Sequence, residues 1–397
     1  MKRIGQMIVV CVLSLSLMTG CWNRRELDEL GILSGVAIDR AGKDYQVAAQ
    51  VIIPDQVNSR TGGGKAPVTL YKAKGATLFE AFRNLTTTSP RKIYTAHIQT
   101  LVLSEEVAHE GVAKVLDLLV RNQETRMNYV VMVAKQVPAE QIMNVLTPLE
   151  KVPADSLFNS LETSSNIWSP VSKITVDMLM DQLTTEGIHP VLPGVTTTGN
   201  APASQAATKE EIDVPVKLVL SELAVFKGDK LAGWLSPSEA RGYNYITDKV
   251  KSSVGHLKCP DGKLLAIEII RTKTKLKCML VNGEPVIEVL VETDSNIGEE
   301  TCNLDISSPV TIKELEQNAE IRANTLMKKS VDTMQQKYKI DIFGFGNLIY
   351  KTHPKLWKTL EKDWDEHFSK LQVIYKTKMH IRNTGMTSNS LTRIMKE

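Results

Sequence analysis

Cys21 is the residue whose surroundings most clearly indicate a chemical reaction, the attachment of a lipid to its thiol. Residues 2–3 are basic and residues 8–18 are apolar, which is the pattern of a cleavable leader and is short for a permanent membrane-spanning helix. The small residues at 19–20 leave the bond before Cys21 accessible to a lipoprotein signal peptidase. We therefore predict that residues 1–20 are removed and that Cys21 becomes a diacylglyceryl-modified N-terminus.

One position departs from the usual lipoprotein pattern, because Met18 stands where Leu, Val or Ile is common. Two alternatives therefore stay open: an ordinary secretory leader with an incidental cysteine, and an uncleaved anchor helix. No long apolar run follows Cys21, so the lipid alone would hold the mature chain. A diacylated cysteine carries more than one acyl chain, which is enough for stable anchoring.

The three residues Trp22, Arg24 and Arg25 follow the predicted lipid site directly. Aromatic rings and cations are favoured at the level of the lipid headgroups, so we expect these side chains to contact the membrane surface. The alternative is a simple spacer between the lipid and the folded domains.

Other patterns give little support for catalysis. Ser89 and Lys92 have Ser-x-x-Lys spacing, but Pro90 follows the would-be nucleophile, where a helical turn should continue. The seven histidines are scattered, and His97, at the head of a strand, is expected to be a hydrogen-bonded structural group. We therefore predict no catalytic residues, no cofactor and no metal site.

The cysteines that would remain in the mature chain after Cys21 are Cys259, Cys278 and Cys302. An odd number cannot pair completely. One disulfide is possible outside the cytoplasm, and three buried or half-buried thiols are an equally good interpretation, so both stay open.

The 397 residues include 42% hydrophobic and 23% charged residues, the balance of an ordinary globular protein with two or three domains. The formal net charge is only +3, from 48 basic and 45 acidic residues. This balance gives no overall field that would attract nucleic acid, so no nucleic-acid partner is predicted.

Strands and helices alternate in residues 21–137, which predicts an N-terminal mixed α/β domain. Residues 32–53 read as a hairpin, and residues 129–134 as a buried strand. Thr77 and Ser104 can each cap a helix that follows them.

The pattern of predicted secondary structure changes after residue 137. Short helical segments separated by proline and serine predict a small middle domain and linker at residues 138–215. A C-terminal α/β domain is predicted at residues 216–397, with a half-exposed antiparallel strand at 264–281 and a long helix at 311–338.

Two local signals stand out within the C-terminal domain. Residues 236–239, Ser-Pro-Ser-Glu, predict a capped helix start. Residues 343–346, Phe-Gly-Phe-Gly, predict a tight turn whose phenylalanines enter the core. The predicted fold class is α+β: three mixed α/β domains in series after the signal peptide, with largely antiparallel or mixed sheets and helices packed on them.

Three segments carry a family resemblance. Residues 21–27, Cys-Trp-Asn-Arg-Arg-Glu-Leu, lead into a strand that ends at Asp39. Residues 97–126 combine a histidine-led strand, a helix and an Arg-x-x-Glu-x-Arg turn. Residues 341–364 combine Asp-x-Phe-Gly-Phe-Gly with a Pro-x-x-Trp helix start, and a basic strand follows. Together they resemble the Ger(x)C family, the lipoprotein C subunits of nutrient germinant receptors in endospore-forming bacteria.

The resemblance implies a non-enzymatic, lipid-anchored receptor subunit on the extracytoplasmic face of the spore inner membrane. It implies work with integral-membrane A and B subunits, so that nutrients trigger germination. Which nutrient is sensed, and whether this subunit binds it, stay open. The alternative from another class is an extracytoplasmic solute-binding lipoprotein that delivers a small molecule to a transporter. Such proteins usually have two similar lobes, whereas this chain shows three dissimilar blocks.

Overall fold

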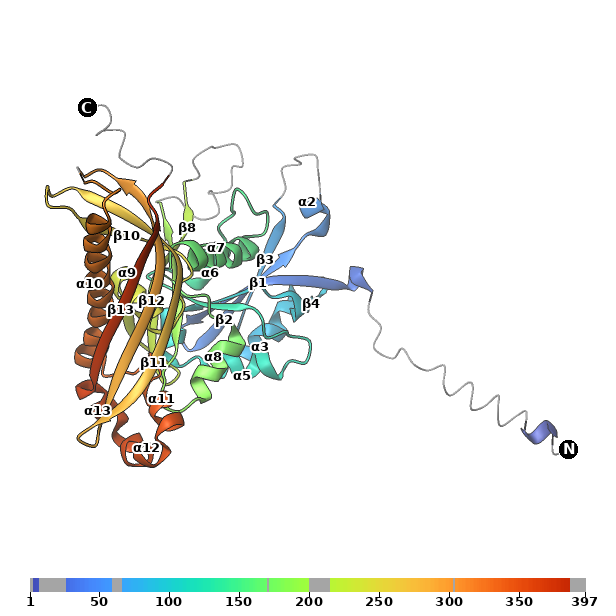
Figure 1. Cartoon of the computed structure of the whole chain (residues 1–397). Helices are drawn as coiled ribbons and strands as arrows, with labels where there is room; N and C mark the ends of the chain where they lie inside the picture. The colour runs from blue at the N-terminus through green and yellow to red at the C-terminus, as the bar shows by residue number, and fades with distance from the viewer. Residues whose placement is uncertain are drawn as a thin grey trace.

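The strands of the chain form two separate sheets, of nine and four strands (Figure 1). This computed structural model describes residues 3–6, 26–58, 66–169, 171–199, 215–302 and 304–385. The α+β fold class predicted from the sequence is confirmed, because both sheets mix parallel and antiparallel pairs and carry packed helices.

The nine-stranded sheet has the order β3-β2-β1-β5-β6-β7-β8-β9, with the short β4 paired beside β1. Its centre is parallel, and every residue of β5 and β6 is buried, as expected for strands covered on both faces. The predicted hairpin is β1 and β2, which turn at Gly42. The strands are β1 (Leu30–Ala41), β2 (Asp44–Ile52), β3 (Val68–Gly75), β4 (Lys92–Tyr94), β5 (Thr100–Ser104), β6 (Val130–Ala134), β7 (Val191–Thr198), β8 (Lys217–Lys227) and β9 (Lys230–Leu235).

Helices cover both faces of this sheet, so alternate residues of β1 enter different cores. Val36 packs in the core beneath α3, α4, α5 and α8, whereas Ala37 packs in the core beneath α6 and α7. The predicted caps are confirmed: Thr77 accepts from Glu80 N–H and Ser104 from Val107 N–H. The helices are α2 (Pro54–Asn58), α3 (Leu78–Asn84), α4 (Glu105–Glu110), α5 (Ala113–Arg121), α6 (Ala139–Met143), α7 (Pro153–Ile167) and α8 (Val176–Thr184), with 3-10 turns η1 (Leu27–Glu29), η2 (Leu85–Thr87) and η3 (Thr95–His97).

The three-domain division at 137/138 and 215/216 remains a prediction about folding units, and the first sheet does not follow it. The sheet takes β7 from the predicted middle block and β8 and β9 from the predicted C-terminal block. The reason is hydrogen bonding: β7 pairs in parallel with β6 and antiparallel with β8, which joins all three blocks in one ladder. Residues 200–214, at the end of the middle domain and linker predicted at 138–215, lie outside the described residues.

The four-stranded sheet has the order β10-β11-β12-β13. The long β11 is antiparallel to both neighbours, as predicted, and β13 joins β12 in parallel. A disulfide between the buried Cys259 and Cys302 settles the open cysteine question, and Cys278 is a free, half-buried thiol. The strands are β10 (Ser253–Lys258), β11 (Leu264–Val281), β12 (Glu284–Glu300) and β13 (Gln372–Asn383).

The long helix predicted at 311–338 is confirmed as α10 followed by one π-helical turn, η5. The turn ends at Lys339, whose φ of 54° breaks the helix. The predicted capping box at Ser236 and Glu239 is present at the start of α9. The remaining helices are α9 (Pro237–Ile246), α10 (Pro309–Thr333), η5 (Met334–Tyr338), α11 (Phe345–Thr352), α12 (Pro354–Leu360), η6 (Glu361–Asp363) and α13 (Trp364–Lys370).

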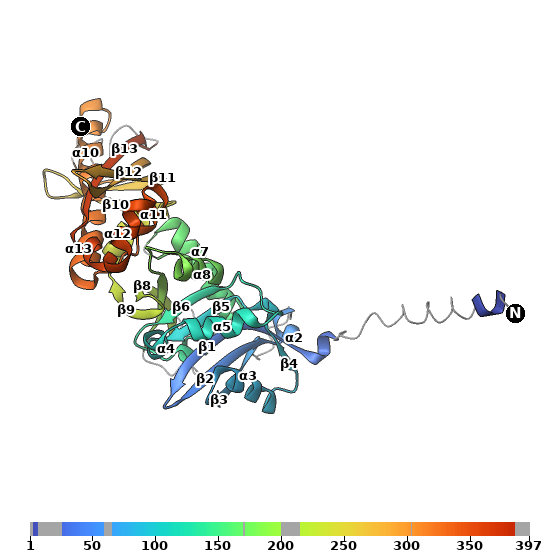
Figure 2. The same cartoon turned by 90° about the horizontal axis from the view of Figure 1, so that it is seen from below.

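The two sheets share one core. Buried residues of β7 and β8, such as Val191 and Val225, belong to the same hydrophobic cluster as Ile287 and Val289 of β12. Figures 1 and 2 both place the start of β1 at one end of the molecule and the four-stranded sheet at the other. Because the two sheets share a core, the start of β1 and the four-stranded sheet are held at opposite ends of the molecule.

Candidate functional site

The four predicted membrane-contacting residues, Cys21, Trp22, Arg24 and Arg25, lie outside the described residues. The described chain resumes at Glu26, passes through η1 and enters β1 at Leu30. Leu30 follows Cys21 by nine residues, and a fully extended chain of that length reaches about 30 Å. Whatever holds Cys21 therefore holds the start of β1 close by.

The start of β1 is fixed in the first sheet. Leu30, Gly31 and Ile32 pair in parallel with the three residues of β4. From residue 33 onward β1 pairs with β2 on one side and, from residue 35, with β5 on the other. The start of β1 is therefore held firmly by its neighbouring strands, and only a short segment separates it from Cys21.

A groove lies beside this strand start, between α3, β4 and α5. We call it the α3–α5 groove, and its volume is about 520 Å³. Phe79, on α3, is 56% exposed at its rim, and the Arg83 guanidinium lies 5.0 Å from the centre of that ring. The groove thus combines apolar walls with cationic edges. Its lining residues are Phe79, Phe82, Arg83, Thr86, Lys92, Ile93, Thr95, Leu118, Leu119, Arg121, Asn122 and Glu124.

The Arg-x-x-Glu-x-Arg turn forms one edge of the groove. Lys92 of β4 forms an ion pair with Glu124, and Asn122 donates to Thr95 Oγ1 at 3.0 Å. The motif therefore positions a loop against β4. His97 differs from its expected role: it lies in η3 with an exposed side chain, and its ring contacts Tyr94 at 6.0 Å between centroids.

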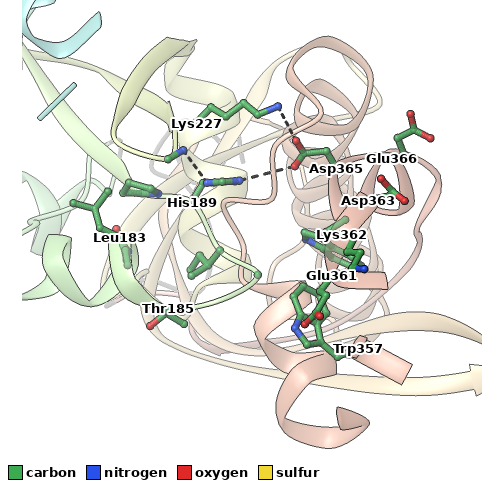
Figure 3. A pocket seen from close by; sticks show the side chains of 16 residues that line it. Leu183, Thr185, His189, Lys227, Trp357, Glu361, Lys362, Asp363, Asp365 and Glu366 are labelled. Carbon is green, nitrogen blue, oxygen red and sulfur yellow. Dashed lines mark hydrogen bonds and ion pairs between the residues drawn. The ribbon is translucent and has the colours of Figure 1, made fainter. Parts of the chain in front are cut away.

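A second concave region lies at the seam between the two sheets, where the end of α8, β7 and the β8–β9 turn face η6, α12 and α13 (Figure 3). Its volume is about 600 Å³. Lys227 Nζ lies 2.7 Å from Asp365 Oδ2, and His189 Nε2 lies 3.9 Å from Asp365 Oδ1. The Gly228 N–H donates to His189 Nδ1 at 3.0 Å. Figure 3 shows the side chains of Lys227, His189 and Asp365 converging across the seam.

The histidine at the seam is held in its neutral form. Burial lowers the pKa of His189 below its usual value, and the charge of Lys227 acts in the same direction against the opposing effect of Asp365. A neutral ring with Nδ1 as acceptor carries its proton on Nε2, which is directed at Asp365. These residues therefore form a structural clamp between the two sheets, and sequence reasoning missed it because its members are far apart in the chain.

A buried carboxyl group organises the turn behind this clamp. Asp341 is fully buried and accepts hydrogen bonds from the N–H groups of Phe343, Gly344 and Gly346 at 2.8 to 3.0 Å. Trp364 Nε1 donates to the same carboxyl at 3.2 Å. Burial raises the pKa of Asp341 to about 6, although the backbone donors lower it.

The predicted Phe-Gly-Phe-Gly turn is confirmed around this carboxyl. Gly344 has a φ of 78°, which a glycine adopts without strain. Phe343 and Phe345 are both buried and stack at 5.1 Å between ring centroids. The turn therefore places both phenylalanine side chains in the hydrophobic core, as the sequence predicted.

The Ser-x-x-Lys pair does not form a nucleophile and its base. Ser89 Oγ donates to the Arg91 carbonyl at 2.7 Å, whereas Lys92 Nζ is held by Glu124. Among the described residues, Cys259, Asp261 and Cys302 are the one group of potential metal ligands close enough to share an ion, and the disulfide uses both of its sulfur atoms.

In the part of the chain that the structure describes, every helix is too short or too polar to cross a bilayer.

Two family models match the chain. The spore germination protein N-terminal domain matches residues 23–197, and the C-terminal domain of the spore germination B3/GerAC-like proteins matches residues 221–385. Spore germination protein KC of Bacillus subtilis (strain 168) is 29% identical over 100% of both chains. Spore germination protein B3 of the same organism is 25% identical over 97% of this chain and 99% of its own.

The fold has also been seen experimentally. The crystal structure of the GerBC protein matches 88% of this chain and 97% of its own, with a TM-score of 0.55 and 20% sequence identity.

Proposed function

Because this chain belongs to the Ger(x)C family of spore germination proteins, we propose that it is the lipid-anchored subunit of a nutrient germinant receptor. In this proposal it sits on the extracytoplasmic face of the spore inner membrane, and it assembles with integral-membrane A and B subunits to trigger germination. Its contribution is assembly and not catalysis, in line with the separate hydrogen-bond partners of Ser89 and Lys92.

The observation that carries the proposal is the short sequence separation between Cys21 and the first sheet. Nine residues join the predicted diacylglyceryl group to a strand start that is paired with β4. A lipid on such a short tether confines a rigid body to within a few nanometres of the bilayer and raises its effective concentration toward membrane neighbours. Weak protein contacts are then sufficient for assembly.

The α3–α5 groove is the exposed apolar surface that lies next to this anchored strand. Its walls include Phe79, Ile93 and Leu118, and β4, which contributes to it, pairs with the start of β1. We therefore assign it to an apolar segment of an integral-membrane receptor subunit. Trp22, Arg24 and Arg25 would contact the lipid headgroups beside it.

The solute-binding alternative has less support. Such a protein would place its ligand between two similar lobes, and here the two sheets have nine and four strands in unrelated orders.

Replacement of the lipidated sulfur tests the proposal. In Cys21→Ala spores, we expect the protein to leave the inner-membrane fraction and nutrient germination to fall at least about tenfold, because the tether no longer supplies local concentration. The matched control is Cys278→Ala, which removes the free thiol of the folded body and should leave both readouts unchanged. Normal membrane retention and normal germination of the Cys21→Ala strain would refute the anchored role.

A further inference from the structure

A third cavity lies between α9, β10 and α10, and two arginines contribute to its lining. It has a volume of about 280 Å³, and both Arg241 of α9 and Arg322 of α10 line it together with His256 of β10. The lining includes no Asp and no Glu. We call this region the arginine cavity.

Arg241 has a buried donor without an acceptor. Its Nε atom is inaccessible to solvent and has no hydrogen-bond partner among the described residues. The contact that does hold the side chain is with Trp168, whose ring centre lies 4.3 Å from the guanidinium carbon. Because solvent cannot reach Nε, an anion in the cavity would have to bind the terminal N–H groups of this guanidinium.

Arg322 brings a second positive charge to the same cavity. Its side chain is exposed, and burial together with the charge of Arg322 lowers the pKa of Arg241 against the opposing effect of Tyr245. An anion within reach of both guanidinium groups would reduce the repulsion between their charges. Their planar donor arrays match the two oxygens of a carboxylate or phosphate.

The walls of the cavity are well fixed. Ser253 Oγ donates to the Trp168 carbonyl at 3.2 Å, and Ser169 Oγ donates to the Ser252 carbonyl at 2.9 Å. These bonds tie the end of α7 to the start of β10, so the Trp168 ring holds the plane of the Arg241 guanidinium. The guanidinium group of Arg241 is therefore positioned before any ligand binds.

We infer that the arginine cavity binds a small soluble oxyanion, a carboxylate or a phosphate, between Arg241 and Arg322. Both views of the molecule place α10 on the side of the four-stranded sheet, away from the start of β1, and Figure 1 places α9 beside α10 (Figures 1 and 2). In the membrane orientation proposed above, the cavity lies away from the anchoring bilayer, so we assign it to a dissolved anion and not to a lipid headgroup.

Calorimetry on the full-length protein in a non-ionic detergent tests this site, with inorganic phosphate and succinate as separate probes at constant ionic strength. We expect saturable binding of at least one probe, weakened at least about tenfold by Arg322→Gln. The exposed Arg322 is the main test, because its replacement leaves the packing of Trp168 intact. Arg241→Lys keeps the positive charge but loses the planar array of N–H donors, so it should weaken binding as well.

Lys313→Gln is the matched control, since it removes one exposed charge from the same helix outside the cavity lining. The comparison of the two probes identifies whether the site prefers a carboxylate or a phosphate. Absence of binding for both probes, equal binding by wild type and Arg322→Gln, or an equal loss in Lys313→Gln would each overturn the inference.

Discussion

Asp341 shows how one side chain can hold two parts of this protein together. Its carboxyl accepts three backbone N–H groups and the Trp364 indole, while its carbonyl accepts the N–H of His189 from the other side of the seam. The sequence pattern around Phe343 predicted the turn correctly. It could not predict the buried acceptor set, because the partners His189 and Trp364 come from segments that meet only in the folded chain.

The substitution Asp341→Asn should therefore destabilise the protein. The new amide N–H₂ would face the N–H groups of Gly346 and Trp364, and two hydrogen bonds to a buried group would be lost. We expect a loss of about 2 to 4 kcal/mol in the free energy of unfolding at pH 7. Denaturant unfolding measures it, and Asp363→Asn, at an exposed position nearby, is the control.

The pH dependence gives a second readout of the same group. The folded protein has a pKa of about 6 for Asp341, above the value of about 4 for an unfolded aspartate. Between these values the folded state binds more protons, so this carboxyl makes stability fall as pH rises from about 4 to 6 and adds no slope above that range. Asp341→Asn should lack this contribution, and an unchanged slope would contradict the assignment.

At the scale of elements, the sequence predicted boundaries well wherever a local signal exists. Ser236, Ser104 and Thr77 cap the helices that follow them, and the long apolar stripe of α10 is real. Contacts between elements that are far apart in the chain could not be predicted from the sequence. Trp168 follows the end of α7 and Arg241 lies in α9, for example, and α8, β7, β8 and β9 separate them in the chain.

The α3–α5 groove provides the element-scale prediction. Phe79 is 56% exposed, so Phe79→Ser should cost little stability, yet it removes the ring that Arg83 covers at the groove edge. We expect several-fold less co-purification of the integral-membrane subunits, with an unchanged melting temperature.

The control for this variant is Ile321→Ser, at a residue of α10 that is 64% exposed and lies outside the groove. It changes a comparable apolar surface at the other end of the molecule. Equal co-purification by Phe79→Ser and wild type would remove the groove from the proposed contact.

At the scale of the whole molecule, the sequence correctly indicated an α+β protein of this family, but it divided the chain where the sheet continues. The ladder from β6 through β7 to β8 crosses both predicted boundaries. Periodicity reports which residues are buried, and it does not report which strand lies next to which. The position of the β1 start at one end of the molecule therefore had to come from the structure, and it is the basis of the proposed orientation at the membrane.

That orientation can be measured by energy transfer to a lipid dye in reconstituted membranes. Single cysteine labels at Arg91 and Lys275, both exposed, are placed in a Cys278→Ala background. Arg91 adjoins the β4 residue that pairs with Leu30, whereas Lys275 lies on the four-stranded sheet. We expect strong transfer from position 91 and weak transfer from position 275, and equal transfer would contradict the proposed orientation.

The most direct measurement is intact mass spectrometry of the mature protein isolated from spore membranes. The account predicts an N-terminus at Cys21, with residues 1–20 absent and a mass increase that corresponds to a diacylglyceryl group on the sulfur. A chain that retains its leader, or one that begins at Cys21 without acyl chains, would contradict the anchored role.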